Sequence, residues 1–340
     1  MTGYERIAAV IAGKKPDTTP VMLHNFMMAA REAGISMATF RSNPHELARA
    51  FIEAIEKYEY DGIMIDVDTV TLAGAVGVPI DFPEDEPARV CGARISSLEE
   101  VDGLLPVDIR TYCGVEVWLE ATRIVKNYFD DQIYIRGNCD QSPFTLASLM
   151  RGISPWMMDL ADPENAERVH ALLNYTTEVT KQFIRLMAET GAHMTSNGDS
   201  VAGPELISPE MYREYALPYE KTIVECSHQL GLPYVIHICG DTTTILDAMI
   251  ETGAEGLELD YRTDAVCART KMQGKSVFIG NIDPSGVLAL GTPQLVEQKT
   301  RELLELFDGN AGFILNAGCA IPPTTPPENL RAMIHIARSF

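Results

Sequence analysis

Short apolar runs recur along the chain, and longer segments whose apolar positions have helical spacing separate them. The runs predict eight β-strands, over residues 20–26, 62–67, 132–139, 191–197, 233–239, 256–261, 276–281 and 312–317. Capping side chains mark the starts of the intervening helices. Asp162, Ser208 and Thr292 each precede a proline, and Thr325 with Glu328 predicts a capping box.

Strands that alternate with helices form a parallel sheet, and eight such repeats predict an α/β fold, a single (β/α)8 TIM barrel. An open doubly wound sheet is the alternative. The second and third predicted strands are too far apart for one βα unit, so an inserted hairpin or helices are expected over about residues 69–130. No linker or repeat divides the chain, and residues 1–340 are predicted to form one domain.

Polar residues follow nearly every predicted strand. They are His24, Asn25, Asp66, Asp68, Asn138, Asp140, Asn197, Asp199, His237, Cys239, Asp260, Asn281, Asp283, Asn316 and Cys319. Barrel enzymes build their active sites at the carboxyl ends of the strands, so the pattern predicts a catalytic mouth. Asn and Asp also favour turns and helix caps, which explains many of them but explains His237 and Cys239 poorly.

His237 and Cys239 end one predicted strand, and Cys319 follows the last one. Residues i and i+2 of a strand face the same side, so the imidazole and the thiol point together into the mouth. Three nitrogen and sulfur ligands with an open fourth position are typical of a catalytic zinc site. The alternative for so short a pattern is a hydrogen-bonded core histidine and a buried thiol.

The charge, the apolar runs and the cysteine count of the chain argue against several classes of function. The chain has 27 Lys and Arg against 48 Asp and Glu, a net charge of −21, which argues against nucleic acid or an anionic membrane as partner. No apolar run reaches the roughly 20 residues of a membrane span. Residues 1–17 do not resemble a signal peptide, so a cytoplasmic protein is expected. The seven cysteines, an odd number, do not indicate a disulfide framework.

Several motifs together resemble the uroporphyrinogen decarboxylase superfamily. They are His-Ile-Cys-Gly at 237–240, Asp-Thr-Thr-Thr at 241–244, Gly-Asn-Ile-Asp-Pro at 280–284, Gly-Asp-Ser at 198–200, Ser-Pro-Glu-Met-Tyr at 208–212 and the segment 318–329. The chain is most similar to the branch of cobalamin-dependent methyltransferases, which includes methylcobamide:coenzyme M methyltransferases and O-demethylase components. The resemblance implies a (β/α)8 barrel with Zn²⁺ held by His237, Cys239 and Cys319.

Within this branch the resemblance leaves two functions. Residues 136–144 and 280–293 are more similar to O-demethylase components, which move a methyl group from a methoxylated compound, commonly a phenyl methyl ether, to a corrinoid protein. Transfer from methylcobamide to a thiol such as coenzyme M is the alternative. Uroporphyrinogen decarboxylase is a further alternative, disfavoured because residues 21–30 lack the arginines that grip substrate carboxylates. A zinc-dependent hydrolase or lyase on the same barrel also stays open.

The supporting residues are assigned as follows. Asp199 and Asp260 are candidate catalytic residues, because a zinc-bound histidine normally donates its other ring N–H to a carboxylate or a carbonyl. Glu205 is the candidate fourth zinc ligand. The candidate substrate-binding residues are Asn138, Asp140, Gln141 and Asn197. The chain lacks an Asp-x-His-x-x-Gly cobalamin motif, so the corrinoid is expected on a partner protein. The sequence leaves the oligomeric state open, with a homodimer as one option.

Overall fold

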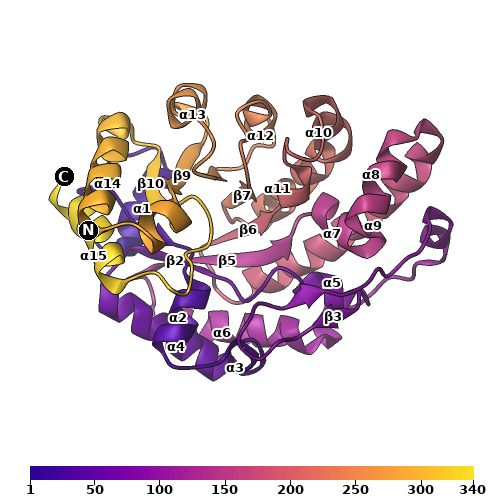
Figure 1. Cartoon of the computed structure of the whole chain (residues 1–340), viewed down its shortest axis with the longest axis horizontal. Helices are drawn as coiled ribbons and strands as arrows, with labels where there is room; N and C mark the ends of the chain where they lie inside the picture. Colours follow the sequence, from indigo (N-terminus) through magenta and orange to yellow (C-terminus); the bar gives the residue numbers. More distant parts are fainter.

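Eight parallel strands form the centre of the molecule in a computed structural model that describes residues 1–340. Figure 1 shows them surrounded by helices. They are β1 (Met22–Leu23), β2 (Gly62–Ile65), β5 (Tyr134–Gln141), β6 (Met194–Gly198), β7 (Tyr234–Ile238), β8 (Gly256–Leu259), β9 (Val277–Ile282) and β10 (Phe313–Ala317). Neighbours pair in that order, and a parallel bridge between Val21 and Leu315 joins the first strand to the last. The predicted (β/α)8 barrel is confirmed.

Helices fill the connections. They are α1 (Gly3–Ile11), α2 (Phe26–Glu32), α3 (Met37–Ser42), α4 (Pro44–Tyr58), α5 (Thr71–Ala75), α6 (Cys113–Phe129), α7 (Pro143–Arg151), α8 (Ile153–Ala161), α9 (Ala166–Ala188), α10 (Pro209–Tyr215), α11 (Leu217–Gln229), α12 (Leu246–Ile250), α13 (Ala265–Met272), α14 (Pro293–Phe307) and α15 (Pro327–Ser339). Short 3-10 or π turns cover Leu98–Gly103, Ile109–Thr111, Pro163–Asn165, Ser200–Ala202 and Pro284–Ala289. None of the helices has the length and apolar character needed to cross a membrane.

The helix caps match the sequence in most places. Ser208 and Thr292 cap α10 and α14 by accepting from backbone N–H groups. Asp162 caps only the short turn Pro163–Asn165. The predicted capping box at Thr325 is wrong, because α15 begins one residue later, with Pro326 at its N-cap position. The Thr325 hydroxyl is buried without a partner.

The segment between β2 and β5 contains α5, an antiparallel hairpin and two 3-10 turns before α6. The hairpin pairs β3 (Ile80–Asp81) with β4 (Arg89–Val90). In Figure 1 it lies with α8 at the end of the molecule opposite the two chain termini. Helix α6 packs against α4 and is the barrel helix of this unit, so the extra structure precedes it.

The barrel interior has two halves of different chemistry. Helix α1 inserts Ile7 and Val10 against the amino ends of the strands, where a small apolar cluster fills the barrel. The cluster also contains Met22, Tyr134, Met194, Val235, Val277, Ile279 and Ile314. Above this cluster, buried polar side chains such as Arg136, His237 and Glu258 line the barrel interior. The apolar plug therefore places the polar half at the carboxyl ends of the strands.

The plug leads to a stability prediction. Replacing the fully buried Ile7 by alanine leaves a cavity under the barrel and should lower the free energy of unfolding by about 2–5 kcal/mol. The measurement is urea denaturation followed by circular dichroism. Ile11→Ala, on the same helix but only partly buried, is the control and should cost clearly less. Equal losses in the two variants would contradict a plugging role for α1.

Candidate metal centre

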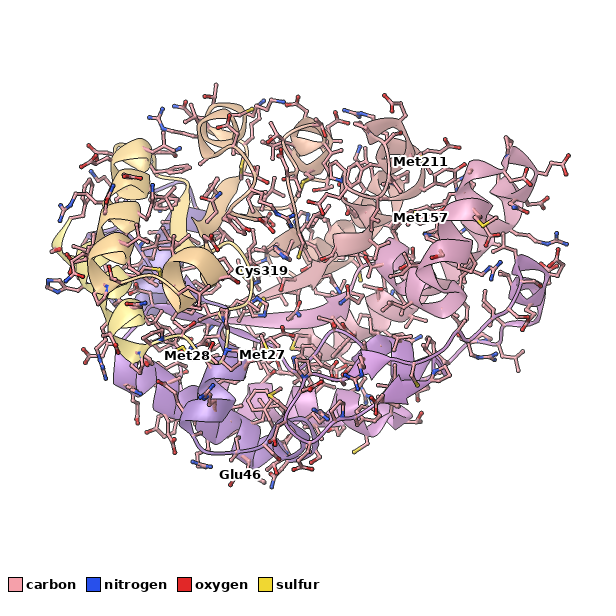
Figure 2. The ribbon with its side chains drawn as sticks, in the orientation of Figure 1. Met27, Met28, Glu46, Met157, Met211 and Cys319 are labelled. Atoms are coloured by element: carbon pink, nitrogen blue, oxygen red, sulfur yellow. The ribbon has the colours of Figure 1, made fainter.

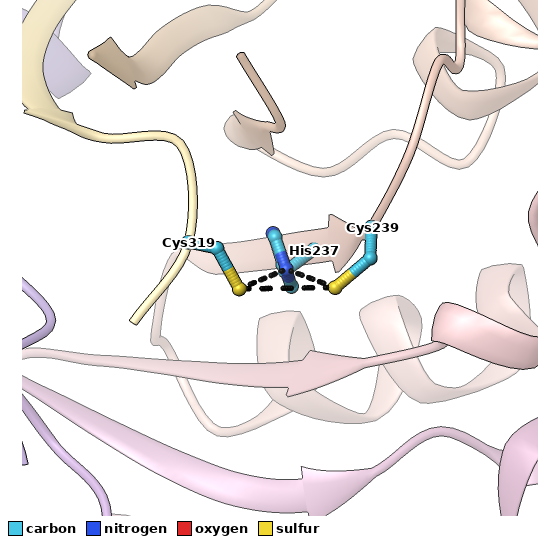
Figure 3. Close-up of side chains that lie close together, drawn as sticks. All are labelled: His237, Cys239 and Cys319. Carbon is cyan, nitrogen blue, oxygen red and sulfur yellow. Dashed lines mark hydrogen bonds between the residues drawn. The ribbon is translucent and has the colours of Figure 1, made fainter. Parts of the chain in front are cut away.

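Three side chains from two distant segments meet at the mouth of the barrel. His237 lies on β7, Cys239 follows that strand, and Cys319, labelled in Figure 2, follows β10. Figure 3 shows the three side chains pointing toward one another. Gly240 then turns the chain with a φ of 90°, a conformation that favours glycine. The i, i+2 relation predicted from the sequence therefore brings imidazole and thiol together.

The spacing of the three donor atoms suits a tetrahedral ion. His237 Nε2 lies 3.1 Å from Cys239 Sγ and 3.8 Å from Cys319 Sγ, and the two sulfurs are 3.8 Å apart. Zinc bonds of about 2.3 Å to sulfur and 2.0–2.1 Å to nitrogen give tetrahedral edges of about 3.5–3.8 Å. The two distances to Cys319 match this range, and the 3.1 Å between His237 and Cys239 is shorter, so these two atoms would separate slightly around the ion. No other group of three or more His, Cys, Asp or Glu residues in the chain has this compactness. The residues present therefore fit Zn²⁺, with one position left for a fourth ligand.

The electrostatics of the three groups are coupled. The hydrogen bond from Cys319 lowers the pKa of the Cys239 thiol to about 3, and His237 and the Ser200 hydroxyl also favour the thiolate against burial. The hydrogen bond to Cys239 raises the pKa of Cys319, and burial adds to this effect. Burial alone would lower the pKa of His237, but the Cys239 thiolate raises it to about 10. The three groups therefore interact strongly, and a bound metal ion would require their deprotonated forms.

The partner of the second histidine nitrogen differs from the prediction. His237 Nδ1 donates to the backbone carbonyl of Glu258, 3.0 Å away, which leaves Nε2 facing the sulfurs. The expectation that Asp199 or Asp260 would accept this bond is wrong. Asp260 instead accepts from the backbone N–H groups of Gly240 and Arg262. Its carboxylate thus fixes the turn after Cys239.

Asp199 is fully buried behind β6 and belongs to a different cluster. One of its oxygens accepts from the backbone and hydroxyl of Thr145. Its other oxygen is buried without a partner, as is one oxygen of Glu220, whose carboxylate accepts from the Tyr212 hydroxyl. Burial raises the pKa of Asp199 to about 6 and that of Glu220 well above its usual range.

Glu205 does not reach the three ligands. Its carboxylate forms an ion pair with Arg262 at 2.6 Å and is more than half exposed at the rim. This pairing explains why it lies outside the compact group, and the assignment as fourth ligand is not supported in this conformation.

The four candidate substrate residues divide into two kinds. Asn138 donates to Asp66 and accepts from Ser196 across the mouth. Gln141 donates only to the Thr69 carbonyl. Asp140 and Asn197 instead hold backbone: Asp140 accepts from the Leu72 N–H, and the Asn197 amide donates to carbonyls at the irregular end of β5. The structure gives these last two a role in shaping the mouth.

Two charged residues near the mouth, Arg136 and Glu258, were not predicted from the sequence, and they pair at 2.6 Å. The predicted strand-end residues His24 and Asp66 pair nearby at 2.7 Å. Arg136 and Glu258 are inward-facing residues of otherwise apolar strands, and a charged residue at such a position is the signal that could have identified them.

The profile of the family described as uroporphyrinogen decarboxylase (URO-D) matches residues 2–340. The chain belongs to this family. The resemblance seen in the sequence is therefore confirmed, and the protein is an enzyme. A methylcobamide:CoM methyltransferase of Methanosarcina acetivorans is 31% identical over 78% of this chain and 80% of its own. A uroporphyrinogen decarboxylase of Mycobacterium ulcerans is 28% identical over 98% of this chain and 96% of its own.

A solved structure agrees with the fold. A methyltransferase from Methanosarcina mazei superposes with a TM-score of 0.91 at 23% sequence identity, covering 100% of this chain and 99% of that one. At this identity the similarity establishes the fold only. The family thus contains members with different reactions, and the residues of the centre must decide between them.

Metal content tests whether His237, Cys239 and Cys319 bind zinc. Protein purified without chelator should carry about one zinc per chain, and His237→Ala and Cys319→Ala should lose it because two ligands hold the ion poorly. Inductively coupled plasma mass spectrometry measures the stoichiometry. Cys267→Ala, a thiol outside the group, is the control and should keep its zinc. Zinc retained in both ligand variants would contradict the assignment.

The pH dependence of stability tests the raised pKa of Asp199. Burial raises the pKa of Asp199 from 3.8 to about 6, so the folded state binds this proton more tightly than the unfolded state. The resulting stabilisation of the fold is complete below about pH 4 and is lost as the pH rises through about 6. A shift of this size corresponds to about 3 kcal/mol. Asp199→Asn mimics the protonated acid, so wild type should lose about that much stability relative to the variant between about pH 4 and 7. Urea denaturation across this range measures the difference, and parallel curves would contradict the raised pKa of Asp199.

Proposed function

We propose that this enzyme is a zinc-containing, corrinoid-dependent methyltransferase that moves a methyl group from a methoxylated substrate to the cobalt of a corrinoid partner protein. A phenyl methyl ether is the proposed substrate class. The observation that carries the proposal is the His237, Cys239 and Cys319 group, spaced for a tetrahedral ion with one position left for another ligand. When bound, zinc supplies a Lewis acid that polarises the heteroatom bearing the methyl group.

The chain's own residues prepare this centre. The Glu258 carbonyl fixes the tautomer of His237, and the Ser200 hydroxyl donates to Cys239 Sγ at 3.1 Å. Asp260 holds the Gly240 turn. These contacts fix the donor atoms before substrate arrives, which lowers the cost of aligning the reacting groups.

A cavity that includes part of the loop after Cys319 is the proposed place for the aromatic ring. It has a volume of about 440 Å³ and lies between α2, the start of α3, the hairpin and the loop after β10. Met27, Ile35, Met37, Pro87 and Pro323 supply apolar walls. Pro323 follows Cys319 by four positions, and the backbone N–H of Ile321 between them bonds to the carbonyl of His24. Arg31, Ser36 and Asp85 add polar groups to the lining, so the cavity suits an aromatic ring that carries polar substituents.

The charges of the mouth disfavour polyanionic substrates. Asp66, Asp68 and Asp140 are buried at the ends of β2 and β5. Arg136, the arginine inside the barrel, is neutralised by Glu258, and His24 is paired with Asp66. A tetracarboxylated porphyrinogen would find no arginine clamp here, and this argues against decarboxylation. A neutral aryl ether carries no such penalty.

Transfer of the methyl group to a thiol is the second candidate. The relatives named methylcobamide:CoM methyltransferases favour it, and a zinc centre with two thiolates also suits activation of a thiol. The two candidates share the centre and differ in the substrate that enters the mouth.

The test is methyl transfer to a reduced corrinoid carried by a corrinoid protein, followed by the absorbance change on alkylation of cobalt. With a methoxylated aromatic as donor, wild type should alkylate the corrinoid. Cys319→Ala should be more than about 100-fold slower, because loss of a metal ligand costs more than loss of a residue that supports a ligand. Cys267→Ala should match wild type. Demethylation of methylcobamide by thiols, with no alkylation from any aryl ether, would favour the second candidate. Failure of both reactions would reject the proposal.

A further inference from the structure

Glu258 contacts both strands that carry metal ligands. It lies on β8, next to β7, and pairs in register with His237. Through its side chain it reaches Asn316 on β10, although β9 lies between the two strands. Asn316 precedes Cys319 by three positions. A single residue thus connects the strand of His237 and Cys239 with the strand of Cys319.

Each contact of Glu258 has a defined geometry. Its backbone carbonyl accepts from His237 Nδ1 at 3.0 Å. One carboxylate oxygen accepts from Asn316 Nδ2 at 3.1 Å, and the other forms an ion pair with Arg136 at 2.6 Å without hydrogen-bond geometry. The side chains of Glu258 and Arg136 are each only 1% exposed. Solvent does not screen these two contacts, so the carboxylate has little freedom to move.

The surrounding charges favour an ionised carboxylate. Arg136 on β5 faces Glu258 directly, and His24, which follows β1, lies 4.0 Å from the same carboxylate. The buried carboxylate therefore has an arginine and a histidine side chain as its neighbours.

We propose that Glu258 is the positioning residue of the metal centre, holding His237 and the Cys319 strand at the spacing that zinc requires. The inference rests on the zinc centre of the proposed function and adds the element that preorganises it. The carbonyl sets the imidazole, and the carboxylate, fixed by Arg136 and Asn316, keeps β8 and β10 at a constant separation. Supporting residues of this kind typically contribute 10- to 100-fold to metal affinity.

The test measures zinc affinity directly, by competition of the full chain with a chromophoric chelator. Glu258→Gln removes the charge with little change in volume and should weaken zinc binding by about 10- to 100-fold. In cobalt-substituted protein the d–d absorption should change as well, because the ligand geometry relaxes. A residue that only stabilises the fold would lower the melting temperature and leave both readouts unchanged.

Asp61→Asn is the matched control. Asp61 is also 1% exposed, and it pairs with Arg6 at 2.9 Å and Arg338 at 2.8 Å at the amino end of the barrel. Loss of this buried charge should reduce stability without changing zinc affinity. Equal weakening of zinc binding in Asp61→Asn and Glu258→Gln would overturn the proposal.

Two further variants keep the test decisive if Glu258→Gln folds poorly. Asn316→Ala preserves the Arg136–Glu258 ion pair, removes the tie to β10, and should weaken zinc binding by up to about 10-fold. Glu258→Leu combined with Arg136→Met leaves no unpaired charge and should restore stability but not affinity. Wild-type zinc affinity in Asn316→Ala or in the double variant would refute the positioning role. A wild-type protein that binds no zinc would instead overturn the proposed function and this inference together.

Discussion

Three electron-rich donor atoms within 3.8 Å of one another, at the mouth of a barrel, need positive charge between them. Their mutual contacts lower the pKa of Cys239 and raise the pKa values of His237 and Cys319. A divalent ion that binds all three donors at once would supply this charge. The remaining features of the mouth follow from the need to hold these atoms at that spacing.

The two ends of the barrel have different roles. Its amino end is filled by an apolar cluster beneath α1, which contributes stability and closes that side. Its carboxyl end contains buried charges that an isolated strand could not tolerate, such as Arg136 and Glu258. They are stable because they pair with each other across the barrel at 2.6 Å. Such pairs contribute little net stability, and their value is in fixing geometry.

The sequence predicted the periodic features well. The eight strands and the i, i+2 relation of His237 and Cys239 depend on local patterns, and a parallel barrel brings the strand ends to one mouth. Contacts across the mouth could not be predicted. Asp199 and Asp260 end strands as expected, yet a backbone carbonyl of Glu258 lies nearer to His237 than either carboxylate. Backbone acceptors have no sequence signal, and the partners of a buried charge such as Glu258 come from strands far away in the chain.

X-ray absorption at the zinc edge of the purified protein would show whether His237, Cys239 and Cys319 bind one zinc ion with a fourth position open to substrate. We expect two sulfur ligands at about 2.3 Å and one imidazole nitrogen at about 2.0–2.1 Å, with a lighter atom completing the shell. The lighter scatterer should change when a methoxylated aromatic is added. A shell of four sulfurs, or one with no sulfur, would rule out this metal centre.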